Sequence, residues 1–333
     1  MEIVKKKKEK IIFVYLGKLP DYAHYSLKIA TKFHHVIILV DQPISIECSN
    51  LEVVDIKSFY SKNNYLSWIE NIRDKINLST LYFREGFWFK TIERFFVLEA
   101  YLRKFDINEV FHGEIDNLFF DLNSIVEYTK KYDKLIYYPM QSKNNASGSI
   151  IYIKDHTGIQ KFCEYIAGLD LYFSDMELLG LYAKNFSSSV GILPSEYGLS
   201  NREIQEGNQK KFIVDAAGIG QYLFGIDPRN TGKPLFNRFK NEHSGDLISK
   251  YKFSIASDFS SCKMFKNDLL IDVVNLHIHS KMHKKLFSSE EFLLKTVSRI
   301  NMNKSTLIHI NIRNLKYLRN ILDFLTRLFY EKK

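Results

Sequence analysis

The sequence predicts an α/β protein: a doubly wound, Rossmann-like sheet flanked by helices, in one domain with an irregular C-terminal half. The first observation is a β-α-β-β beginning, in which short apolar runs flank a segment of helical spacing at 22–33. The second is that helical and strand patterns continue to alternate up to residue 169. Beyond residue 200 the pattern becomes irregular, and the 333 residues contain neither an internal repeat nor an obvious linker. An open sheet of this kind binds ligands at the carboxyl ends of its strands.

The individual elements follow from the spacing of apolar residues. Strands are expected where short apolar, β-rich runs occur, at 11–16, 36–40, 51–56, 134–138, 149–154, 273–279 and 306–312. Helices are expected where apolar residues recur every three to four positions, at 22–33, 91–105, 122–131, 157–169, 177–183 and 314–330. Strand character from 109 to 120 breaks at Gly113, and the polar stretches 200–211 and 226–250 are expected to be loops or irregular structure.

Composition and charge exclude several classes of protein. With 45% hydrophobic and 26% charged residues, the chain is neither disordered nor a coiled coil. Three cysteines without a CxxC pair favour a reducing compartment over a disulfide framework or a structural zinc site. The net charge of +9 lies largely in Lys5–Lys8, in Lys281–Lys285 and near the C-terminus, and no nucleic-acid-binding motif accompanies it, so we expect no nucleic acid partner. No apolar run reaches membrane-spanning length, so we expect a cytoplasmic protein, with peripheral contact at the inner face of the membrane as an option.

An acidic motif, Glu114-Ile115-Asp116, follows the apolar residues that end at Gly113. Two carboxylates at i and i+2 lie on one side of an extended chain. Hard divalent cations such as Mg²⁺ and Mn²⁺ prefer oxygen ligands of this kind and share their remaining positions with water or a diphosphate. The alternative for this motif alone is an exposed turn with two incidental acids.

A second polar motif lies far downstream, at Asn275-Leu276-His277-Ile278-His279-Ser280-Lys281. In a strand, His277, His279 and Lys281 share one face. An imidazole can complete a Mn²⁺ site, and an ammonium group beyond it can offset the charge of a diphosphate. A histidine pair that stands alone is more often structural, but together with the acidic motif it indicates a cation site.

These segments together resemble a bacterial nucleotide-sugar glycosyltransferase of the GT-A fold, over most of the chain. The resemblance is carried by LGKLPDY at 16–22, VIILVD at 36–41, Arg94-Phe95, the acidic motif at 114–116 and HIHSK at 277–281. The acidic motif stands where the family has DxD, with Glu in place of the first Asp. HIHSK resembles the HxxGxxK-type closing motif of the retaining galactosyltransferase and glycogenin-like branch, but it lacks the glycine.

The resemblance implies a GT-A type mixed sheet and three functional parts. The nucleotide-binding half is expected at 11–140 and the half for acceptor and donor sugar at 141–312. At 313–333 the chain ends in a basic amphipathic helix, which packs on the domain or lies at an anionic membrane surface.

The resemblance also implies a divalent cation, Mn²⁺ or Mg²⁺, that bridges the acidic motif and the diphosphate of the donor. Asp116 is then the surest metal ligand, and Glu114 binds the metal or the ribose. Of the two histidines that we name as metal ligands, His277 is favoured over His279. Lys281 is expected to lie on the diphosphate.

Two further residues are expected to contact the donor. Asp41, at the carboxyl end of an early strand, is expected to reach the uracil or the ribose. Arg94 is expected to approach the donor sugar or phosphate from its helix. The alternative for Arg94, equally weighted, is a surface arginine on an amphipathic helix.

Catalytic candidates come from two other segments. In FIVDAAGIGQYLFGID (212–227), four residues are candidates for a loop that approaches the donor closely: Asp215, Gly218, Gly220 and Gln221. In the retaining branch a Gln or Asp near this position lies under the sugar, so Gln221 and Asp215 are catalytic candidates; the alternative is that Asp215 caps the following helix. Asp175 is a candidate general base for an acceptor hydroxyl in an inverting mechanism, or an N-cap.

The function implied by the resemblance is transfer of a sugar from a nucleotide-sugar donor, UDP-sugar being favoured, to a glycan or lipid-linked glycan. Surface polysaccharide, lipooligosaccharide and capsule are the acceptor classes expected of such an enzyme. A nucleotidyltransferase on a similar sheet and a non-catalytic nucleotide-sugar-binding or assembly protein of a polysaccharide pathway are the alternatives. Hydrolysis is disfavoured, because there is no G-x-S-x-G elbow and the two carboxylates are neighbours rather than opposed.

Overall fold

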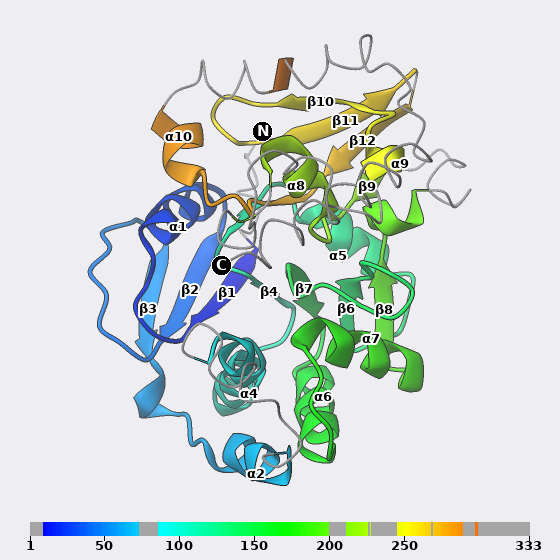
Figure 1. The fold of residues 1–333 in the computed structure, drawn as a ribbon. Helices are drawn as coiled ribbons and strands as arrows, with labels where there is room; N and C mark the ends of the chain where they lie inside the picture. Colours follow the sequence, from blue (N-terminus) through cyan, green and yellow to red (C-terminus); the bar gives the residue numbers. More distant parts are fainter. Residues whose placement is uncertain are drawn as a thin grey trace, which may run out of the picture.

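Seven strands form the central sheet of the computed structural model, which describes residues 9–72, 86–199, 211–225, 227, 245–267, 269–288 and 297–298. In the order of the sheet the strands are β3 (Leu51–Asp55), β2 (His35–Val40), β1 (Lys10–Tyr15), β4 (Val110–Gly113), β7 (Ile150–Ile153), β6 (Ile136–Pro139) and β8 (Val190–Leu193) (Figure 1). β7 runs antiparallel to both of its neighbours, whereas the other pairs are parallel. The predicted mixed α/β sheet is therefore confirmed.

Helices cover both faces of this sheet, because successive residues of a strand point to opposite sides. Ile12 and Val14 of β1 share one core with four helices: α2 (Asn63–Ile72), α4 (Phe87–Phe105), α6 (Thr157–Ala167) and α7 (Asp175–Asn185). Ile11 and Phe13 face the other side, where they share a core with α1 (Asp21–Phe33) and α5 (Asn123–Thr129). Single-turn helices η1 (Ile56–Ser58) and η3 (Glu196–Gly198) follow β3 and β8.

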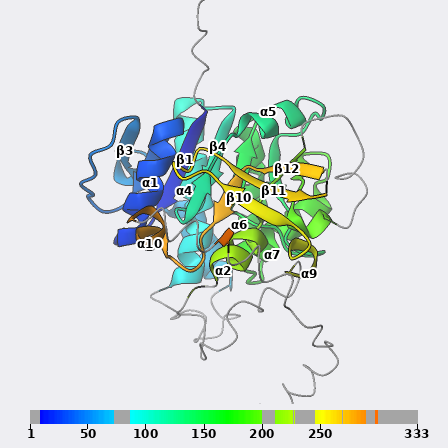
Figure 2. The ribbon, with the colours of Figure 1, turned by 90° about the horizontal axis from the view of Figure 1, so that it is seen from above.

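A second layer of chain lies against the α1 and α5 side, at the top of Figure 1. It holds a four-stranded sheet of β10 (Lys252–Ile255), β11 (Cys262–Lys266), β12 (Leu269–Val273) and β9 (Phe212–Ile213), with α8 (Gly218–Phe224) and α9 (Gly245–Ile248). Both views place α10 (His283–Ser288) beside α1, where Phe287 stacks on Tyr25 (Figure 2). The second layer thus covers the edge of the sheet at which β1 and β4 end.

The strand expected at 273–279 is in fact two strands, and this expectation was wrong. β12 ends at Val273 in the four-stranded sheet, and β13 (Asn275–His277) pairs antiparallel with β5 (Asn117–Phe119). Val274 lies between them, with its N–H bonded to Ile213 and its carbonyl to the N–H of Phe120. The chain therefore changes partner strands at Val274, and it leaves extended structure after His277.

Several expectations fall outside the described residues. These are the strand at 306–312, the helix at 314–330 and most of the polar stretches 200–211 and 226–250. Within the part of the chain that is described, no helix is both long and apolar enough to cross a bilayer.

The packing of α7 gives a test of the fold. A Cβ at Gly180 would lie 1.9 Å from the backbone oxygen of Asn144, and a backbone atom cannot move aside as a flexible side chain can. We expect Gly180→Ala to lower the free energy of unfolding by about 1–3 kcal/mol, the usual range for overpacking. Gly168→Ala is the control, because its added methyl meets nothing closer than 3.6 Å. Denaturant titration should show a shifted midpoint for the first variant alone, and equal stability of the two would contradict this packing.

Candidate metal centre

The pairing of β5 with β13 brings the two polar motifs together. His277 lies opposite Asn117, and Leu276 lies opposite Leu118. Immediately beyond the pair, the N–H of Ile278 donates a hydrogen bond of 2.9 Å to the carbonyl of Asp116. Two segments more than 150 residues apart in sequence are thus held side by side by backbone hydrogen bonds. The predicted convergence of Asp116 and His277 is therefore present.

Glu114, Asp116 and His277 form a set of ligand atoms that all lie within 4.8 Å of one another. Glu114 and Asp116 occupy the turn between β4 and β5, and His277 ends β13. His277 Nε2 is 3.2 Å from Glu114 Oε2 and 3.2 Å from Asp116 Oδ1. Neighbouring ligands of an octahedral ion with bonds of about 2.1 Å lie about 3.0 Å apart. The spacing and the two-oxygen, one-nitrogen donor set therefore fit Mn²⁺ or Mg²⁺ with only small adjustment.

The carboxylates of this set are held in their ionised form. Burial acts to raise the pKa of Asp116, but attraction to His277 and Lys281 outweighs it and keeps the pKa well below its ordinary value. For Glu114, burial is likewise outweighed, by Arg94 first and His277 second, and its pKa is lowered. Burial also opposes the charged form of His277, whose pKa is nevertheless raised by Asp116 and Glu114. The site therefore concentrates negative oxygen atoms at a place largely shielded from water.

Arg94 lies behind Glu114, inside the protein. Its two terminal nitrogens are each 2.8 Å from a carboxylate oxygen, one of Glu114 and one of Asp175. Only 7% of Arg94 is exposed, so the surface arginine on an amphipathic helix is excluded. Gly148 makes room for it, since a Cβ there would be 2.5 Å from the guanidinium. Arg94 therefore fixes the direction in which Glu114 points.

Asp175 is buried in the first turn of α7, and the N-cap of that helix is Ser174. Ser174 and Glu177 form a capping box, so the N-cap alternative for Asp175 was wrong by one residue. Burial raises the pKa of Asp175 to about 6, against the opposing attraction of Arg94. The structure thus joins Asp175 to the acidic motif through Arg94.

Asp215 is completely buried and accepts four backbone hydrogen bonds. Three come from the start of α8, at Ala217, Ile219 and Gly220, and one of 2.8 Å comes from the N–H of His277. This is the capping role that the sequence offered as the alternative, extended to the candidate ligand strand. Gly220 allows α8 to lie close to β13, because a Cβ there would lie 2.1 Å from the carbonyl oxygen of His277. Gln221, the next residue of α8, is half-buried.

His279 and Lys281 differ from their predicted positions because β13 ends at His277. The His279 ring lies beside that of His277, with centroids 4.0 Å apart, but among the described residues it contributes no atom to the ligand set. Burial, followed by His277, lowers the pKa of His279 to about 3. Lys281 has a φ of 56°, and its ammonium group contacts Asp116. The single strand face that we expected for these three residues does not exist.

Asp41 lies at the carboxyl edge of the central sheet, as predicted. Its Oδ1 accepts a hydrogen bond of 2.7 Å from the N–H of Gly17, in the turn that follows β1. Gly17 has a φ of 104°, a conformation that side chains rarely adopt. Asp41 therefore fixes the connection between β1 and α1.

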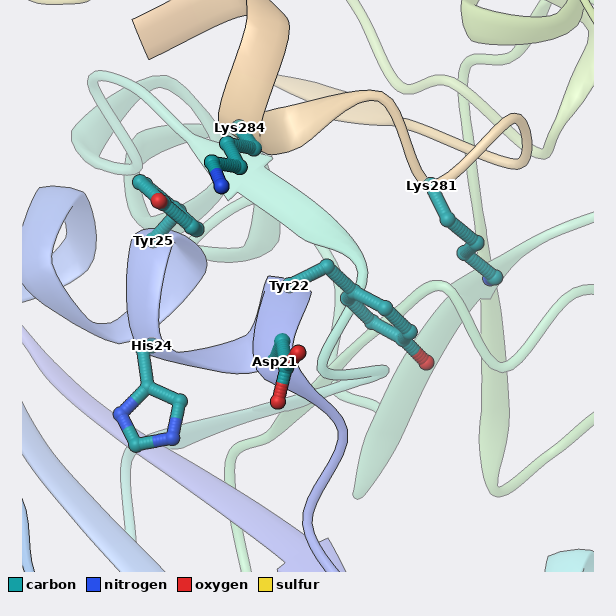
Figure 3. Close-up of a pocket in the computed structure, with 6 residues that line it drawn as sticks. All are labelled: Asp21, Tyr22, His24, Tyr25, Lys281 and Lys284. Carbon is teal, nitrogen blue, oxygen red and sulfur yellow. The ribbon is translucent and has the colours of Figure 1, made fainter. Parts of the chain in front are cut away.

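The sequence did not identify a cavity of about 500 Å³ beside Lys281. The N-terminal part of α1 supplies Asp21, Tyr22, His24 and Tyr25. Lys281 comes from the segment after β13, and Lys284 from the start of α10 (Figure 3). Lys281 Nζ is 5.1 Å from the centre of the Tyr22 ring. Lys281 therefore touches both the candidate metal centre and the cavity.

The segment from 277 to 283 also holds polar atoms that lack partners. Within the described chain, four of its buried side-chain atoms have no hydrogen-bond partner: His277 Nδ1, His279 Nε2, Ser280 Oγ and His283 Nδ1. Buried polar groups are normally paired, and an unpaired one is destabilising unless a ligand or water completes it. The segment beside the candidate ligands therefore has hydrogen-bonding capacity that the described residues do not use.

The comparisons with known proteins are distant. No protein-family model and no curated protein matches the chain. Similar solved structures include mouse xyloside xylosyltransferase 1, with 7% identity, a TM-score of 0.35, and coverage of 56% of this chain and 85% of that one. GlyE, a glycosyltransferase of Streptococcus pneumoniae, has 11% identity and a TM-score of 0.37, over 59% of this chain and 46% of its own. The galactosyltransferase LgtC, in complex with donor and acceptor sugar analogues, has 13% identity and a TM-score of 0.34, over 60% of this chain and 80% of its own. At TM-scores this low the likeness assigns no function, which has to come from the site itself.

The contact between Asp215 and His277 predicts a positioning role that can be measured. In Asp215→Asn an NH₂ group replaces one oxygen, so the amide cannot accept all four N–H groups. We expect Mn²⁺ affinity to fall about tenfold or more, as is usual when a group that orients a ligand is removed. Glu196→Gln is the control, because Glu196 bonds Ala216 and Gly218 but not the candidate ligand strand. Equal Mn²⁺ affinity of the two folded variants, by calorimetry, would show that Asp215 has a structural role only.

Glu196 also predicts a pH dependence of stability. Burial, and then repulsion from Asp215, raises the pKa of Glu196 to about 8, above its ordinary value near 4.5. The folded protein therefore retains a proton that the unfolded chain releases, so this group's contribution to stability falls as pH rises from about 5 to 8. In Glu196→Gln this contribution is absent. We expect the free energy of unfolding of the wild type, relative to that of the variant, to fall by up to about 1 kcal/mol per pH unit in that window. Urea titrations of both proteins at pH 5, 6, 7 and 8 test this. If the wild type keeps or gains stability relative to the variant as pH rises, the raised pKa of Glu196 is contradicted.

Proposed function

We propose that the chain is a glycosyltransferase that moves a sugar from a nucleotide-sugar donor, with UDP-sugar favoured, to a glycan acceptor. Glu114, Asp116 and His277 would hold a divalent cation, Mn²⁺ or Mg²⁺. The observation that carries the proposal is the convergence of these three side chains beside a cavity that presents two lysines.

The cavity has the chemistry that a nucleoside diphosphate requires. Lys281 and Lys284 supply positive charge, and the aromatic rings of Tyr22 and Tyr25 supply flat apolar surface. The unpaired histidine and serine atoms of 277–283 belong to the same segment as Lys281. A volume of about 500 Å³ lies within the range of small-molecule sites. We infer that the diphosphate lies between the metal centre and Lys284, and that Asp41 and the start of α1 face the nucleoside.

The chain's own residues would act mainly by orientation and charge. When bound, the cation supplies Lewis-acid stabilisation of the negative charge that develops on the leaving diphosphate. Lys281 would stabilise the same charge from the cavity side. Arg94, itself held by Asp175, binds one oxygen of Glu114, which leaves the other oxygen of Glu114 directed at His277.

The structure gives different degrees of support to the three catalytic candidates, Asp175, Asp215 and Gln221. Asp175 keeps its proposed role as general base, supported by its raised pKa near neutrality but opposed by its ion pair with Arg94. For Asp215 the four backbone hydrogen bonds support a positioning role. Gln221, which follows Gly220 in α8, stays a candidate for contact with the donor sugar.

The acceptor and the location are proposals from the sequence. A surface polysaccharide, lipooligosaccharide or capsule acceptor, lipid-linked or not, suits the donor class. The basic helix proposed to contact the membrane, at 313–333, lies outside the described residues.

Donor hydrolysis without an acceptor tests the proposal, because many donors break down slowly in a competent site. UDP-, GDP- and CMP-sugars would be incubated with Mn²⁺ or Mg²⁺, and release of the free nucleotide would be measured. We expect turnover of one donor class, lowered at least a hundredfold in Asp116→Asn, since the ion contributes electrostatic stabilisation of this size. Asp258→Asn, at an exposed aspartate, is the matched control and should keep wild-type rates.

The same assay separates the alternatives. Cation-dependent nucleotide binding without hydrolysis of any donor would favour the non-catalytic binding protein. Release of pyrophosphate from a nucleoside triphosphate and a sugar phosphate would favour a nucleotidyltransferase. If no nucleotide binds in the presence of either ion, the proposed function is wrong.

A further inference from the structure

Lys281 has two sets of neighbours, and they belong to different parts of the site. Its ammonium group contacts Asp116 Oδ2, the second oxygen of the carboxylate whose Oδ1 faces His277 in the candidate metal centre. The same side chain lines the cavity and lies over the Tyr22 ring. Figure 3 shows Lys281 and Tyr22 extending into the same space from the segment after β13 and from α1.

Positive groups already face the carboxylates of the site. Among the described residues, Arg94 contacts Glu114 and Asp175, and Lys281 contacts Asp116. A divalent cation placed at Asp116 would be repelled by an ammonium group that stayed in contact with the same carboxylate. Ion binding is therefore favoured when Lys281 moves away.

Lys281 is the positive group that is free to move. Arg94 has only 9% of its side chain exposed and is fixed by two carboxylates, and His277 is itself a candidate ligand. The Lys281 side chain is 20% exposed, borders an open cavity and, among the residues that the structure describes, forms an ion pair with one carboxylate. It can rotate from Asp116 into that cavity without disturbing a packed element.

We propose that Lys281 and the divalent cation exchange at Asp116: the ammonium group occupies the carboxylate in the ion-free protein and is released into the cavity when the ion binds. The exchange rests on the proposed function, whose ion site it uses. It couples the ion to the donor, because the released ammonium group becomes available to the diphosphate. The effect is reciprocal: a bound diphosphate that holds Lys281 away from Asp116 strengthens ion binding. By linkage, the bound ion strengthens diphosphate binding by an equal factor.

Binding of Mn²⁺ alone, without nucleotide, tests the exchange. Lys281→Met removes the competing ammonium group and keeps a side chain of similar length. We expect Mn²⁺ to bind Lys281→Met at least about fivefold tighter than wild type, the lower end of typical coupling factors, measured by calorimetry or by the resonance of free Mn²⁺. Lys284→Met is the matched control: it removes the same charge from the same cavity without a contact to Asp116, and its Mn²⁺ affinity should stay within twofold of wild type.

A second measurement does not depend on a variant. Amine acetylation of the wild-type protein, quantified by mass spectrometry, should modify Lys281 faster when Mn²⁺ is added, because its ammonium group leaves Asp116. Lys284 should react at the same rate in both states. Lys281→Arg, which retains the charge, should bind Mn²⁺ as weakly as wild type.

The outcomes separate the exchange from the proposed function. If wild type and Lys281→Met bind Mn²⁺ equally and Lys281 acetylation does not respond, the exchange is wrong and the ion site stands. If neither folded protein binds Mn²⁺ or Mg²⁺, the ion site fails and the exchange fails with it. Equal tightening in Lys281→Met and Lys284→Met would show a general effect of charge, and the specific exchange would be wrong.

Discussion

The candidate site depends on the register of one short strand pair, β5 with β13. Each strand has three residues, and backbone hydrogen bonds over so short a length cannot by themselves select one register. Three buried polar side chains do so. Asn275 donates to Asn117 and to the carbonyl of Asp215 and accepts from the N–H of Asp215, and Asp215 in turn accepts from the N–H of His277.

A slip of one residue would break this network and turn His277 to the opposite face. The groups left without partners would be buried, and each such loss is destabilising by about 1–3 kcal/mol. The polar network therefore specifies the register, and the register places Asp116 beside His277. Ser149, whose hydroxyl donates to the carbonyl of Asp215, ties the same network to the central sheet at β7.

The sequence predicted those parts of the structure that follow from local periodicity. The continuous apolar run of β1 encodes a strand buried on both faces, and the helical spacing in α1 encodes one buried face, so the first half of the sheet could be predicted closely. The position of His279 could not be predicted correctly. Side chains two residues apart share a face only while the strand continues, and β13 ends at His277. Arg94 was ambiguous because its partner Asp175 lies 81 residues away, and no local pattern records that contact. Tyr22 and Lys284 were missed for the same reason, since a cavity between α1 and the segment after β13 is a property of tertiary packing.

The two carboxylates of the site are held by different positive side chains, Glu114 by an arginine that is fixed and Asp116 by a lysine that can move. This difference has a consequence for ion binding. Glu114 is paired with Arg94, whose planar guanidinium is fixed on its far side by Asp175, so one oxygen of Glu114 is permanently occupied. Asp116 is paired with a lysine at the edge of a cavity, so its second oxygen is occupied only conditionally. An ion at this site would therefore find one ligand already oriented and another that it must compete for. A purely structural ion-pair cluster gains nothing from such an asymmetry, because a buried charge is most stable when every partner is fixed. The asymmetry is what a site needs if one of its cations has to leave when the ligand arrives.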